Sequence, residues 1–303
     1  MSLQLNFESL KGKKIAYPES EDPRILDAAK IIKKKYGIIP ILIPKHESEK
    51  RKEFTKKTID SILLKKGKSA NETTYDHIDD PYFFAGSLLQ NKEVDCVISG
   101  CICPTSHVIR SALATNLLQS QTKIMTSCFY MEFEHLNKNF IFADCAVIPE
   151  PTPENLSEIA FLSQQAFLKW TKETPKIAFL SFSTNGSANH ENSKKIRKAY
   201  EIFHKNYPNI CSYGEIQFDA AFVPDVSNKK CPNSPLNGDA NVFIFPDLNS
   251  GNICYKSSQY LGNGKAYGPI LLGCENPFSD LSRGASVNDI VHCSLLTLLL
   301  SEN

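Results

Sequence analysis

The sequence predicts an α/β fold with a largely parallel sheet, in a chain long enough for two domains. Short apolar runs alternate with amphipathic helical patterns along nearly the whole chain, which is typical of βαβ units. The chain has 303 residues, of which 42% are hydrophobic and 22% charged, an ordinary globular composition. Three prolines within residues 149–153 interrupt the alternation, and we expect a hinge between domains there.

The first half of the chain is expected to supply five strands and three helices. The predicted strands are residues 14–17, 38–43, 94–99, 123–130 and 140–143. A helix with apolar residues at helical spacing from 25 to 32 follows the turn at 18–23, and another is predicted at 107–118. The helix at 81–90 begins at Pro81, a position where the missing N–H of proline costs nothing. The lysine-rich region 46–79 has no readable pattern.

The second half repeats the alternation after the prolines. Strands are predicted at residues 177–182, 215–218, 241–245 and 267–272, and helices at 154–170, 194–205 and 253–261. Two polar loops, 183–193 and 228–239, separate these elements. The chain closes with an almost wholly apolar helix from Ile290, which must be buried.

Charge, cysteines and apolar segments exclude several classes of protein. A net charge of +1 gives no field strong enough to recruit nucleic acid or an anionic membrane. The ten cysteines include no C-x-x-C pair, and several lie in apolar runs, where a reduced cysteine acts as a small hydrophobe. Residues 1–14 lack the apolar core of a secretory leader, and no stretch is long enough to span a membrane. We therefore expect a reduced, cytoplasmic protein.

Four predicted strand-to-helix loops carry unusual polar content, namely residues 99–110, 181–187, 246–252 and 279–289. In a parallel sheet, ligands bind beyond the carboxyl ends of the strands. The second and third loops are rich in Gly, Ser, Thr and Asn, which lets backbone N–H groups turn toward an anion. Nucleotide fingerprints such as G-x-G-x-x-G and metal motifs such as H-E-x-x-H are absent from the sequence. These loops predict an anion-binding α/β enzyme with no metal.

The loop before the final helix offers two interpretations. It places a hydroxyl (Ser282), a cation (Arg283) and a carboxylate (Asp289) within a few residues, on a rigid mount suited to catalysis. Ser286 and Asp289 also have the spacing of a helix capping box. The loop alone leaves both roles of Asp289 open.

Several motifs occur in the order found in one enzyme family. They are Gly214-Glu-Ile-Gln-Phe-Asp-Ala-Ala-Phe-Val-Pro224, Ala240-Asn-Val-Phe-Ile-Phe-Pro-Asp-Leu-Asn-Ser-Gly-Asn-Ile253, Tyr267-Gly-Pro-Ile-Leu-Leu272 and Asp280-Leu-Ser-Arg-Gly-Ala-Ser-Val-Asn-Asp-Ile290. Earlier pieces, such as Phe142-Ala-Asp-Cys-Ala-Val147, Pro18-Glu19 and Asp22 with Arg24, fit as well. Together they resemble the phosphate acetyltransferases of the phosphate acetyl/butyryltransferase family. The resemblance covers nearly the whole chain.

The resemblance implies a two-lobed α/β/α fold of the isocitrate/isopropylmalate dehydrogenase-like kind, with the active site in the interdomain cleft. The first domain would comprise residues 1–147 together with 268–303, and an inserted second domain would comprise 148–267. The resemblance also implies a homodimer.

The activity implied by the resemblance is reversible transfer of acetyl between phosphate and coenzyme A. The partners implied are acetyl-CoA, coenzyme A, acetyl phosphate and inorganic phosphate, with coenzyme A as a substrate and no cofactor. Asp289 resembles the base that takes the thiol proton, Ser282 the hydroxyl that stabilises the tetrahedral intermediate, and Arg283 the arginine that holds the phosphoryl group. Further substrate contacts are implied at Arg110, Ser183, Thr184, Gly186, Asn249, Gly251 and Asn252.

The sequence departs from the family pattern at three places. The loop 99–107 reads Ser-Gly-Cys-Ile-Cys-Pro-Thr-Ser-His, the family's lysine in loop 181–187 is replaced by Asn185, and the basic segment at 63–67 lacks its arginine. These changes concern contacts to coenzyme A, whereas the proposed catalytic loop is intact. Two alternatives stay open: a phosphate butyryltransferase, and a catalytically silent paralogue that binds acyl-CoA or acetyl phosphate.

Overall fold

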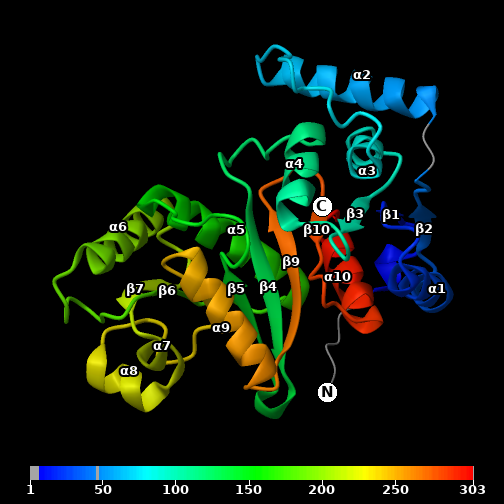
Figure 1. The fold of residues 1–303 in the computed structure, drawn as a ribbon. Helices are drawn as coiled ribbons and strands as arrows, with labels where there is room; N and C mark the ends of the chain where they lie inside the picture. Colours follow the sequence, from blue (N-terminus) through cyan, green and yellow to red (C-terminus); the bar gives the residue numbers. More distant parts are fainter. Residues whose placement is uncertain (1–6, 46–47, 303) are drawn as a thin grey trace. The chain divides into compact units, whose positions relative to one another are not determined.

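The structure, a computed structural model, describes residues 7–45 and 48–302. Residues 1–6, which begin the N-terminal stretch 1–14, lie outside the described residues, as do residues 46 and 47 of the lysine-rich region. The chain forms two compact units, each with a sheet and helices (Figure 1): unit 1 contains Ile124–Tyr267, and unit 2 contains Asn6–Lys123 with Gly268–Asn303. The predicted α/β class is confirmed. The domain boundaries predicted from the sequence, 1–147 with 268–303 and 148–267, remain a proposal.

Unit 2 is built on a short, mostly parallel sheet. Its strands are β1 (Lys14–Tyr17), β2 (Ile39–Leu42), β3 (Cys96–Ser99), β10 (Phe278–Asp280) and the end of β9 (Lys265–Leu272). They follow the order β2-β1-β3-β10-β9, with β10 parallel to β3 and antiparallel to β9. Because β1, β3 and β10 run in one direction, their carboxyl ends open at the same edge of the sheet. Chain segments far apart in sequence therefore meet at this edge.

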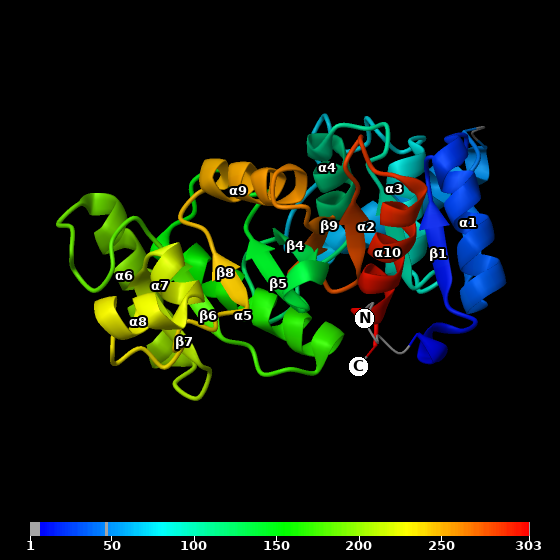
Figure 2. The same cartoon turned by 90° about the horizontal axis from the view of Figure 1, so that it is seen from below.

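Among the described residues of unit 2, five helices accompany the sheet. They are α1 (Pro23–Tyr36), α2 (Glu49–Lys65), α3 (Pro81–Gln90), α4 (Thr105–Thr115) and α10 (Val287–Leu299), and a 3-10 turn occupies Glu8–Leu10. Helix α1 packs against α10, whereas α2, α3 and α4 pack together. Figures 1 and 2 show these two groups on the two faces of the strands. Helix α10 is buried on nearly every side, as its apolar sequence predicts.

The strands of unit 1 run in mixed directions. Its strands are β4 (Thr126–Phe133), β5 (Lys138–Ala143), β6 (Ile177–Leu180), β7 (Ser212–Ile216) and β8 (Val242–Ile244), in the order β4-β5-β8-β6-β7. Only β4 and β5 pair antiparallel among these five strands of the described chain. The helices are α5 (Pro153–Thr171), α6 (Glu191–Asn206), α7 (Phe218–Phe222), α8 (Pro224–Lys230) and α9 (Leu248–Tyr260), with a 3-10 turn at Glu134–Leu136.

Side chains that alternate along the strands of unit 1 are buried on both faces of the strands. Phe129, Met131 and Phe243 belong to a core cluster that α7, α8 and α9 cover. Tyr130 points to the other face and meets Trp170 of α5 edge to face, with ring centroids 5.7 Å apart. Figure 2 shows α9 and α5 on opposite faces of β5 and β8. Helices on both faces and the parallel pairing explain why these strands read as continuous apolar runs.

Most predicted elements are present, and the differences have local causes. The sequence missed α2, whose buried residues include Thr55 and Thr58, so its apolar stripe is weak. It also missed α7, α8 and β10, which have 5, 7 and 3 residues. Helix α9 begins at Leu248 rather than at 253, because Asp247 caps its first turn through the Ser250 N–H at 2.9 Å.

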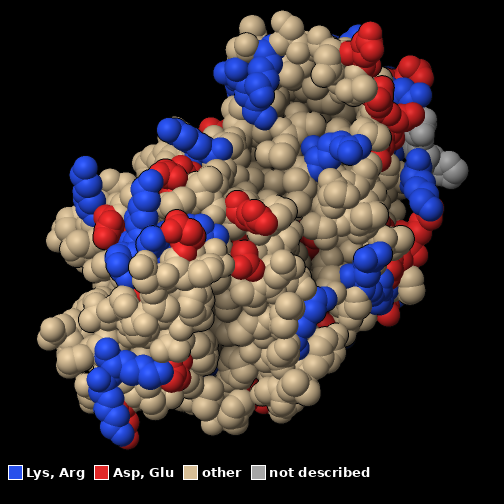
Figure 3. Space-filling model, turned by 60° about the vertical axis from the view of Figure 1, so that its left-hand side comes forward, with Lys and Arg blue, Asp and Glu red and all other residues tan. Residues whose placement is uncertain are grey.

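The surface carries both signs of charge. On the face shown in Figure 3, lysine and arginine side chains stand among aspartates and glutamates, in agreement with the net charge of +1. Within the described ranges, no helix combines the length and the apolar character needed to cross a membrane.

Candidate active site

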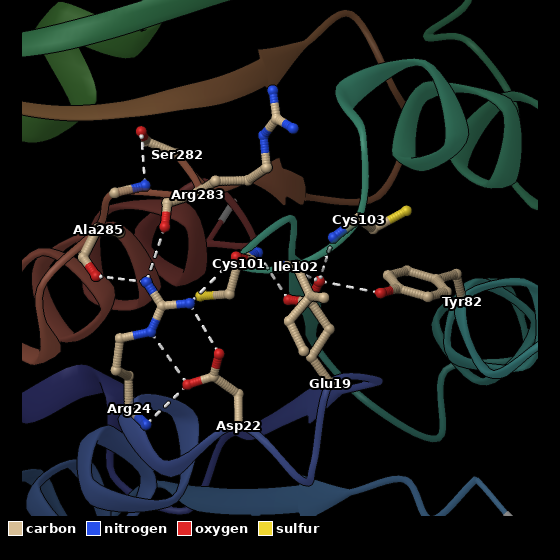
Figure 4. A network of polar contacts seen from close by, with 11 residues as sticks. Glu19, Asp22, Arg24, Tyr82, Cys101, Ile102, Cys103, Ser282, Arg283 and Ala285 are labelled. Carbon is tan, nitrogen blue, oxygen red and sulfur yellow. Dashed lines mark hydrogen bonds and ion pairs between the residues drawn. The ribbon is translucent and has the colours of Figure 1, made fainter.

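The edge of unit 2 where β1, β3 and β10 end is held together by a buried carboxylate. Glu19, which follows β1, accepts hydrogen bonds from the backbone N–H groups of residues 101, 102 and 103 at 2.8, 2.9 and 3.1 Å. The hydroxyl of Tyr82 donates a fourth bond at 2.9 Å (Figure 4). Glu19 is 5% exposed, so these four donors replace the water that the carboxylate has lost. The loop after β3 is thereby fixed to the loop after β1.

A second residue, Arg24, connects this edge to the predicted catalytic loop. Its guanidinium forms a two-pronged ion pair with Asp22, at 3.0 and 2.7 Å, and donates to the carbonyl oxygens of Arg283, Ala285 and Cys101 at 2.8, 3.0 and 3.1 Å (Figure 4). The Arg24 guanidinium also holds the pKa of the Asp22 carboxyl below its usual value. One planar cation thus joins three segments of unit 2.

The turn after β10 presents the hydroxyl of Ser282 and the guanidinium of Arg283 to solvent. Both residues are exposed, and the turn is closed by a hydrogen bond from the Ala285 N–H to the Ser282 carbonyl at 2.9 Å. The Ser282 Oγ accepts a long hydrogen bond of 3.3 Å from the Gly284 N–H, which leaves its O–H free to donate. The Arg283 guanidinium points away from Arg24 (Figure 4) and pairs with no described residue.

Asp289 forms the capping box that its spacing predicts. Its Oδ2 accepts hydrogen bonds from the N–H and the hydroxyl of Ser286, at 2.8 and 2.7 Å, and the Ser286 Oγ accepts from the Asp289 N–H at 3.2 Å. The other carboxylate oxygen, Oδ1, accepts no hydrogen bond from the residues that the structure describes. Capping and proton transfer are therefore compatible, because each role needs a different oxygen.

Arg110 lies on the exposed side of α4, next to two histidines. Its Nη1 is 3.3 Å from the Nε2 of His77. The neighbouring His107, which stands in the atypical loop 99–107, pairs with Asp80, the N-cap of α3, at 2.8 Å. The two imidazole rings meet edge to face, with centroids 5.4 Å apart. Arg110 thus keeps most of its guanidinium available to an anion, while His107 has a structural partner.

A buried acid, Asp280, ends β10 directly before the Ser282 turn. It is 1% exposed and is paired in register with Ser99 of β3. Its Oδ1 lies so close to Gly100 that a Cβ added there would be 2.2 Å from it, which explains the glycine. Burial, together with the charge of Glu19, raises the pKa of Asp280 to about 7, against the opposing effects of Thr105 and Arg283.

In unit 1, the predicted substrate loop 181–187 is folded around Glu215, which is itself buried. Glu215 accepts from the Ser183 hydroxyl at 2.7 Å and from the Gly186 N–H at 3.1 Å, and it forms an ion pair with Arg197. Burial opposes its ionisation, but these donors hold the pKa of Glu215 below its usual value. The hydroxyl of Thr184, the next predicted residue, accepts from the Gln217 N–H at 2.9 Å. The hydroxyl groups of Ser183 and Thr184 therefore stabilise the conformation of the loop.

The remaining predicted residues lie in the first turns of α9. Asn249 is exposed, whereas Gly251 is buried against the loop after β5, where an added Cβ would be 2.3 Å from the carbonyl oxygen of Asp144. The Asn252 amide donates to the Cys145 carbonyl at 3.1 Å. Gly251 and Asn252 therefore attach α9 to the loop after β5, and Asn249 remains open to solvent.

The cysteines of the edge loop of unit 2 are poor nucleophiles. Burial raises the pKa of Cys101 to about 12 and that of Cys103 to about 11, so both stay protonated at neutral pH. In the part of the chain that the structure describes, no group of three His, Cys, Asp or Glu residues is placed to hold a metal ion.

The structure thus brings Ser282, Arg283 and Asp289 onto one mount and adds three supporting residues that sequence reasoning did not assign. These are Glu19, Arg24 and Asp280. Glu19 and Arg24 bind partners more than 60 positions away, and Asp280 pairs with Ser99 of β3, so local spacing gives no sign of these tertiary contacts. The available signal was that Glu19 and Asp280 are carboxylates placed directly at the ends of buried strands.

Comparison with known proteins identifies the family. Residues 5–298 match the model of the phosphate acetyl/butaryl transferase family. The phosphate acetyltransferase of Acetivibrio thermocellus is 34% identical over 96% of this chain and 94% of its own, and that of Thermoanaerobacterium thermosaccharolyticum is 38% identical over 92% of each. A phosphotransacetylase from Streptococcus pyogenes has a similar structure, with a TM-score of 0.87 and 33% identity over 97% of this chain and 96% of its own. The chain therefore belongs to the phosphate acetyl/butaryl transferase family.

Proposed function

We propose that this protein is a phosphate acetyltransferase, which transfers acetyl reversibly between acetyl phosphate and coenzyme A. The observation that carries the proposal is the mount formed by the turn after β10 and the start of α10. It offers an exposed hydroxyl (Ser282), an unpaired guanidinium (Arg283) and a free carboxylate oxygen (Asp289 Oδ1) from one short, internally braced segment. Relatives that carry this activity in their names match over nearly the whole chain.

Asp289 is proposed as the base for the coenzyme A thiol. A thiol with a pKa of about 8.5 is mostly protonated at neutral pH, and only the thiolate is a good nucleophile. Asp289 Oδ1 would accept the thiol proton while Oδ2 stays bonded to Ser286. The capping bonds then fix the orientation of the carboxylate that does the chemistry.

Ser282 and Arg283 are proposed to stabilise the charge that develops during transfer. The thiolate attacks the carbonyl carbon of acetyl phosphate, a C–S bond forms, and negative charge moves onto the carbonyl oxygen, to which the Ser282 hydroxyl donates. The C–O bond to phosphate then breaks, and the phosphate leaves with the bonding electron pair. Arg283 holds the phosphate throughout, as a planar guanidinium suits phosphate oxygens. In the reverse direction, phosphate attacks acetyl-CoA.

Arg110 and the loops of unit 1 are proposed to bind the substrates. Arg110 would hold a second anionic group, and the backbone of residues 183–186 and the exposed Asn249 would contact coenzyme A. Asn185 takes the place of a family lysine, so we expect weaker affinity for coenzyme A than a lysine would give. Coenzyme A is a substrate here, and no cofactor is proposed.

We also propose a cytoplasmic homodimer. The ten cysteines are free in the structure, which suits a reducing compartment. Ile253, Tyr260 and Leu261, on and just after α9, are 64%, 78% and 88% exposed, an apolar stripe that a second copy would cover. Light scattering at increasing protein concentration would test the dimer, with Tyr260→Lys as the disrupting variant.

A thiol-consumption assay tests the activity. Coenzyme A should consume acetyl phosphate in a reaction that depends on both substrates, faster than it consumes butyryl phosphate. Faster use of butyryl phosphate would make the protein a phosphate butyryltransferase. Binding of coenzyme A or acetyl phosphate without turnover would identify a catalytically silent paralogue.

A further inference from the structure

Asp280 is a buried acid that the proposed mechanism does not use, although it lies two residues before Ser282. It is 1% exposed, and neither of its carboxylate oxygens makes a hydrogen bond of normal geometry with a described residue. The close contact with Gly100 leaves no space for a side chain that could approach from that position. Ionisation of a carboxyl group in such surroundings is unfavourable, because the charged form has no water around it.

The groups that surround Asp280 come from four segments. Glu19 follows β1, Cys101 and Cys103 lie in the loop after β3, Thr105 begins α4, and Arg283 belongs to the turn after β10. Glu19 repels a charged Asp280, and its four hydrogen-bond donors are already committed to it. Both cysteines remain thiols, and the Thr105 hydroxyl is a neutral donor that also favours the ionised form of Asp280. Arg283 is therefore the cation in this set that favours the ionised form of Asp280.

We propose that Asp280 controls the anion affinity of Arg283 through its own proton. When Asp280 is protonated, Arg283 has no ion-pair partner among the described residues, and its charge is available to a phosphate group. When Asp280 is ionised, it adds a negative charge three residues before Arg283, which repels the same phosphate group. This inference rests on the proposed function, in which Arg283 binds phosphate. Asp280 is thus a positioning residue that acts through Arg283.

The proposal makes anion binding and proton binding depend on each other. A dianion bound to Arg283 neutralises the positive charge that favours ionised Asp280. Its binding therefore raises the pKa of Asp280 further, and the carboxyl group takes up a proton from the solvent. The pKa of the unliganded group, raised by burial to about 7, places this exchange at neutral pH. Anion affinity should therefore fall as the pH rises through neutrality.

Sulfate is the probe of choice, because it stays a dianion across the neutral range, whereas phosphate itself titrates there. Calorimetry on the full-length protein should give a dissociation constant about tenfold higher at about pH 8.5 than at about pH 6, the effect of one added charge near a dianion. Near neutrality, the binding heat should change between two buffers of different ionisation enthalpy, which reports proton uptake. In Asp280→Asn both effects should be absent, whereas Asp27→Asn, an exposed aspartate of α1, should behave as wild type.

The outcomes separate the two proposals. Sulfate binding that is absent, or that Arg283→Ala leaves unchanged, would overturn the phosphate role of Arg283 and the inference that depends on it. Binding that needs Arg283 but shows the same pH dependence in wild type and Asp280→Asn would overturn the inference alone. Carbon-13 labelling of aspartate gives a second measurement, independent of variants. One carboxyl should titrate near neutrality and shift to higher pH with sulfate, and a spectrum in which every carboxyl titrates below about pH 5 contradicts the proposal.

Discussion

The guanidinium of Arg24 donates a 2.8 Å hydrogen bond to the backbone carbonyl of Arg283, a residue 259 positions later in the chain. The same guanidinium bonds the carbonyl of Ala285, so it grips both sides of Gly284 in the predicted catalytic turn. Asp22 holds Arg24 in place, because its carboxylate accepts two hydrogen bonds from the guanidinium. The first helix of the chain thereby fixes the conformation of the turn that precedes the last helix.

Replacing Arg24 by lysine should reduce turnover while the fold survives. A lysine keeps the positive charge but cannot bond Asp22 and three carbonyls at once, so the turn should lose its fixed geometry. A misplacement of about 1 Å in a catalytic group costs about 10²-fold in rate. We expect kcat to fall by about that factor, measured by thiol consumption. Arg51→Lys is the matched control, since Arg51 bonds the carbonyl of Pro44 outside this network, and equal activity losses in both variants would contradict the role of Arg24.

Asp289→Asn should separate capping from proton transfer. The amide oxygen can still accept from Ser286, so we expect a stability cost well under about 1 kcal/mol. The variant has no proton acceptor for the thiol, so kcat should fall by about 10²–10⁴-fold. Activity should recover as the pH rises toward the thiol pKa of about 8.5, because the thiolate then forms without a base.

Two further variants calibrate that result. Ser286→Ala removes the hydroxyl from the cap but keeps the Asp289 carboxylate and its hydrogen bond from the backbone N–H of residue 286, so it should cost about 1 kcal/mol in thermal unfolding and far less in turnover than Asp289→Asn. Ser282→Ala should lower kcat without rescue at high pH, because it removes a hydrogen-bond donor rather than a base. Near wild-type turnover in Asp289→Asn would restrict Asp289 to the capping box.

Arg283→Ala and Arg110→Ala should weaken binding of anionic substrate groups. A hydrogen bond to a charged group contributes roughly 1.5–3 kcal/mol, so the KM for acetyl phosphate should rise about tenfold or more in Arg283→Ala. A fall in kcat as well would place the contact in the transition state. Steady-state kinetics with both substrates varied measure these effects, and unchanged values in both variants would remove the arginines from the site.

The combined change of Cys101, Cys103 and Cys128 to serine should leave turnover largely intact. Burial raises the pKa of Cys101 and Cys103 to about 12 and about 11, so neither is a thiolate at neutral pH, and transfer is expected to be direct within a ternary complex. Initial-rate patterns should intersect. Parallel lines, or a trapped acetyl-enzyme, would instead favour a covalent intermediate.

Asp280 should also make stability depend on pH. Its folded-state pKa is raised to about 7 from 3.8, so the folded state binds the proton more tightly than the unfolded state. The stabilisation is complete below about pH 4 and is lost as the pH rises through about 7, with a total of up to about 4 kcal/mol. Relative to wild type, Asp280→Asn should therefore gain stability in urea unfolding as the pH increases. A constant difference across that range would show that Asp280 is ionised throughout.

Some elements could be predicted from the sequence because their signals are local. Helix α3 occupies the predicted residues 81–90, since Asp80 accepts from the Tyr82 N–H at 2.8 Å and Pro81 starts the helix. Strand β10 could not be predicted, because its three residues are too few for a periodic pattern and its pairing with β3 spans the sequence. Helices α7 and α8 are short and divided by Pro224, which hides the helical spacing.

The candidate site likewise contains residues that could be predicted from local sequence and residues that could not. Ser282, Arg283 and Asp289 lie within eight consecutive residues, and the capping box follows from the spacing of Ser286 and Asp289. The role proposed for Asp289 beyond capping rests on resemblance to a family, since a capping aspartate and a catalytic one look alike in sequence. Glu19, Arg24 and Asp280 draw their roles from tertiary contacts, and the burial that sets the properties of Asp280 exists only in the folded chain.

The position of β10 between β3 and β9 has a consequence for the newly made chain. During synthesis, β3 is complete some 180 residues before its neighbour β10 leaves the ribosome. Until then, the edge of β3 exposes unpaired backbone groups that can pair with another nascent chain. The segment from β10 to α10 therefore both protects this edge and supplies the proposed catalytic turn, so we expect a chain that ends before β10 to be inactive and prone to aggregate.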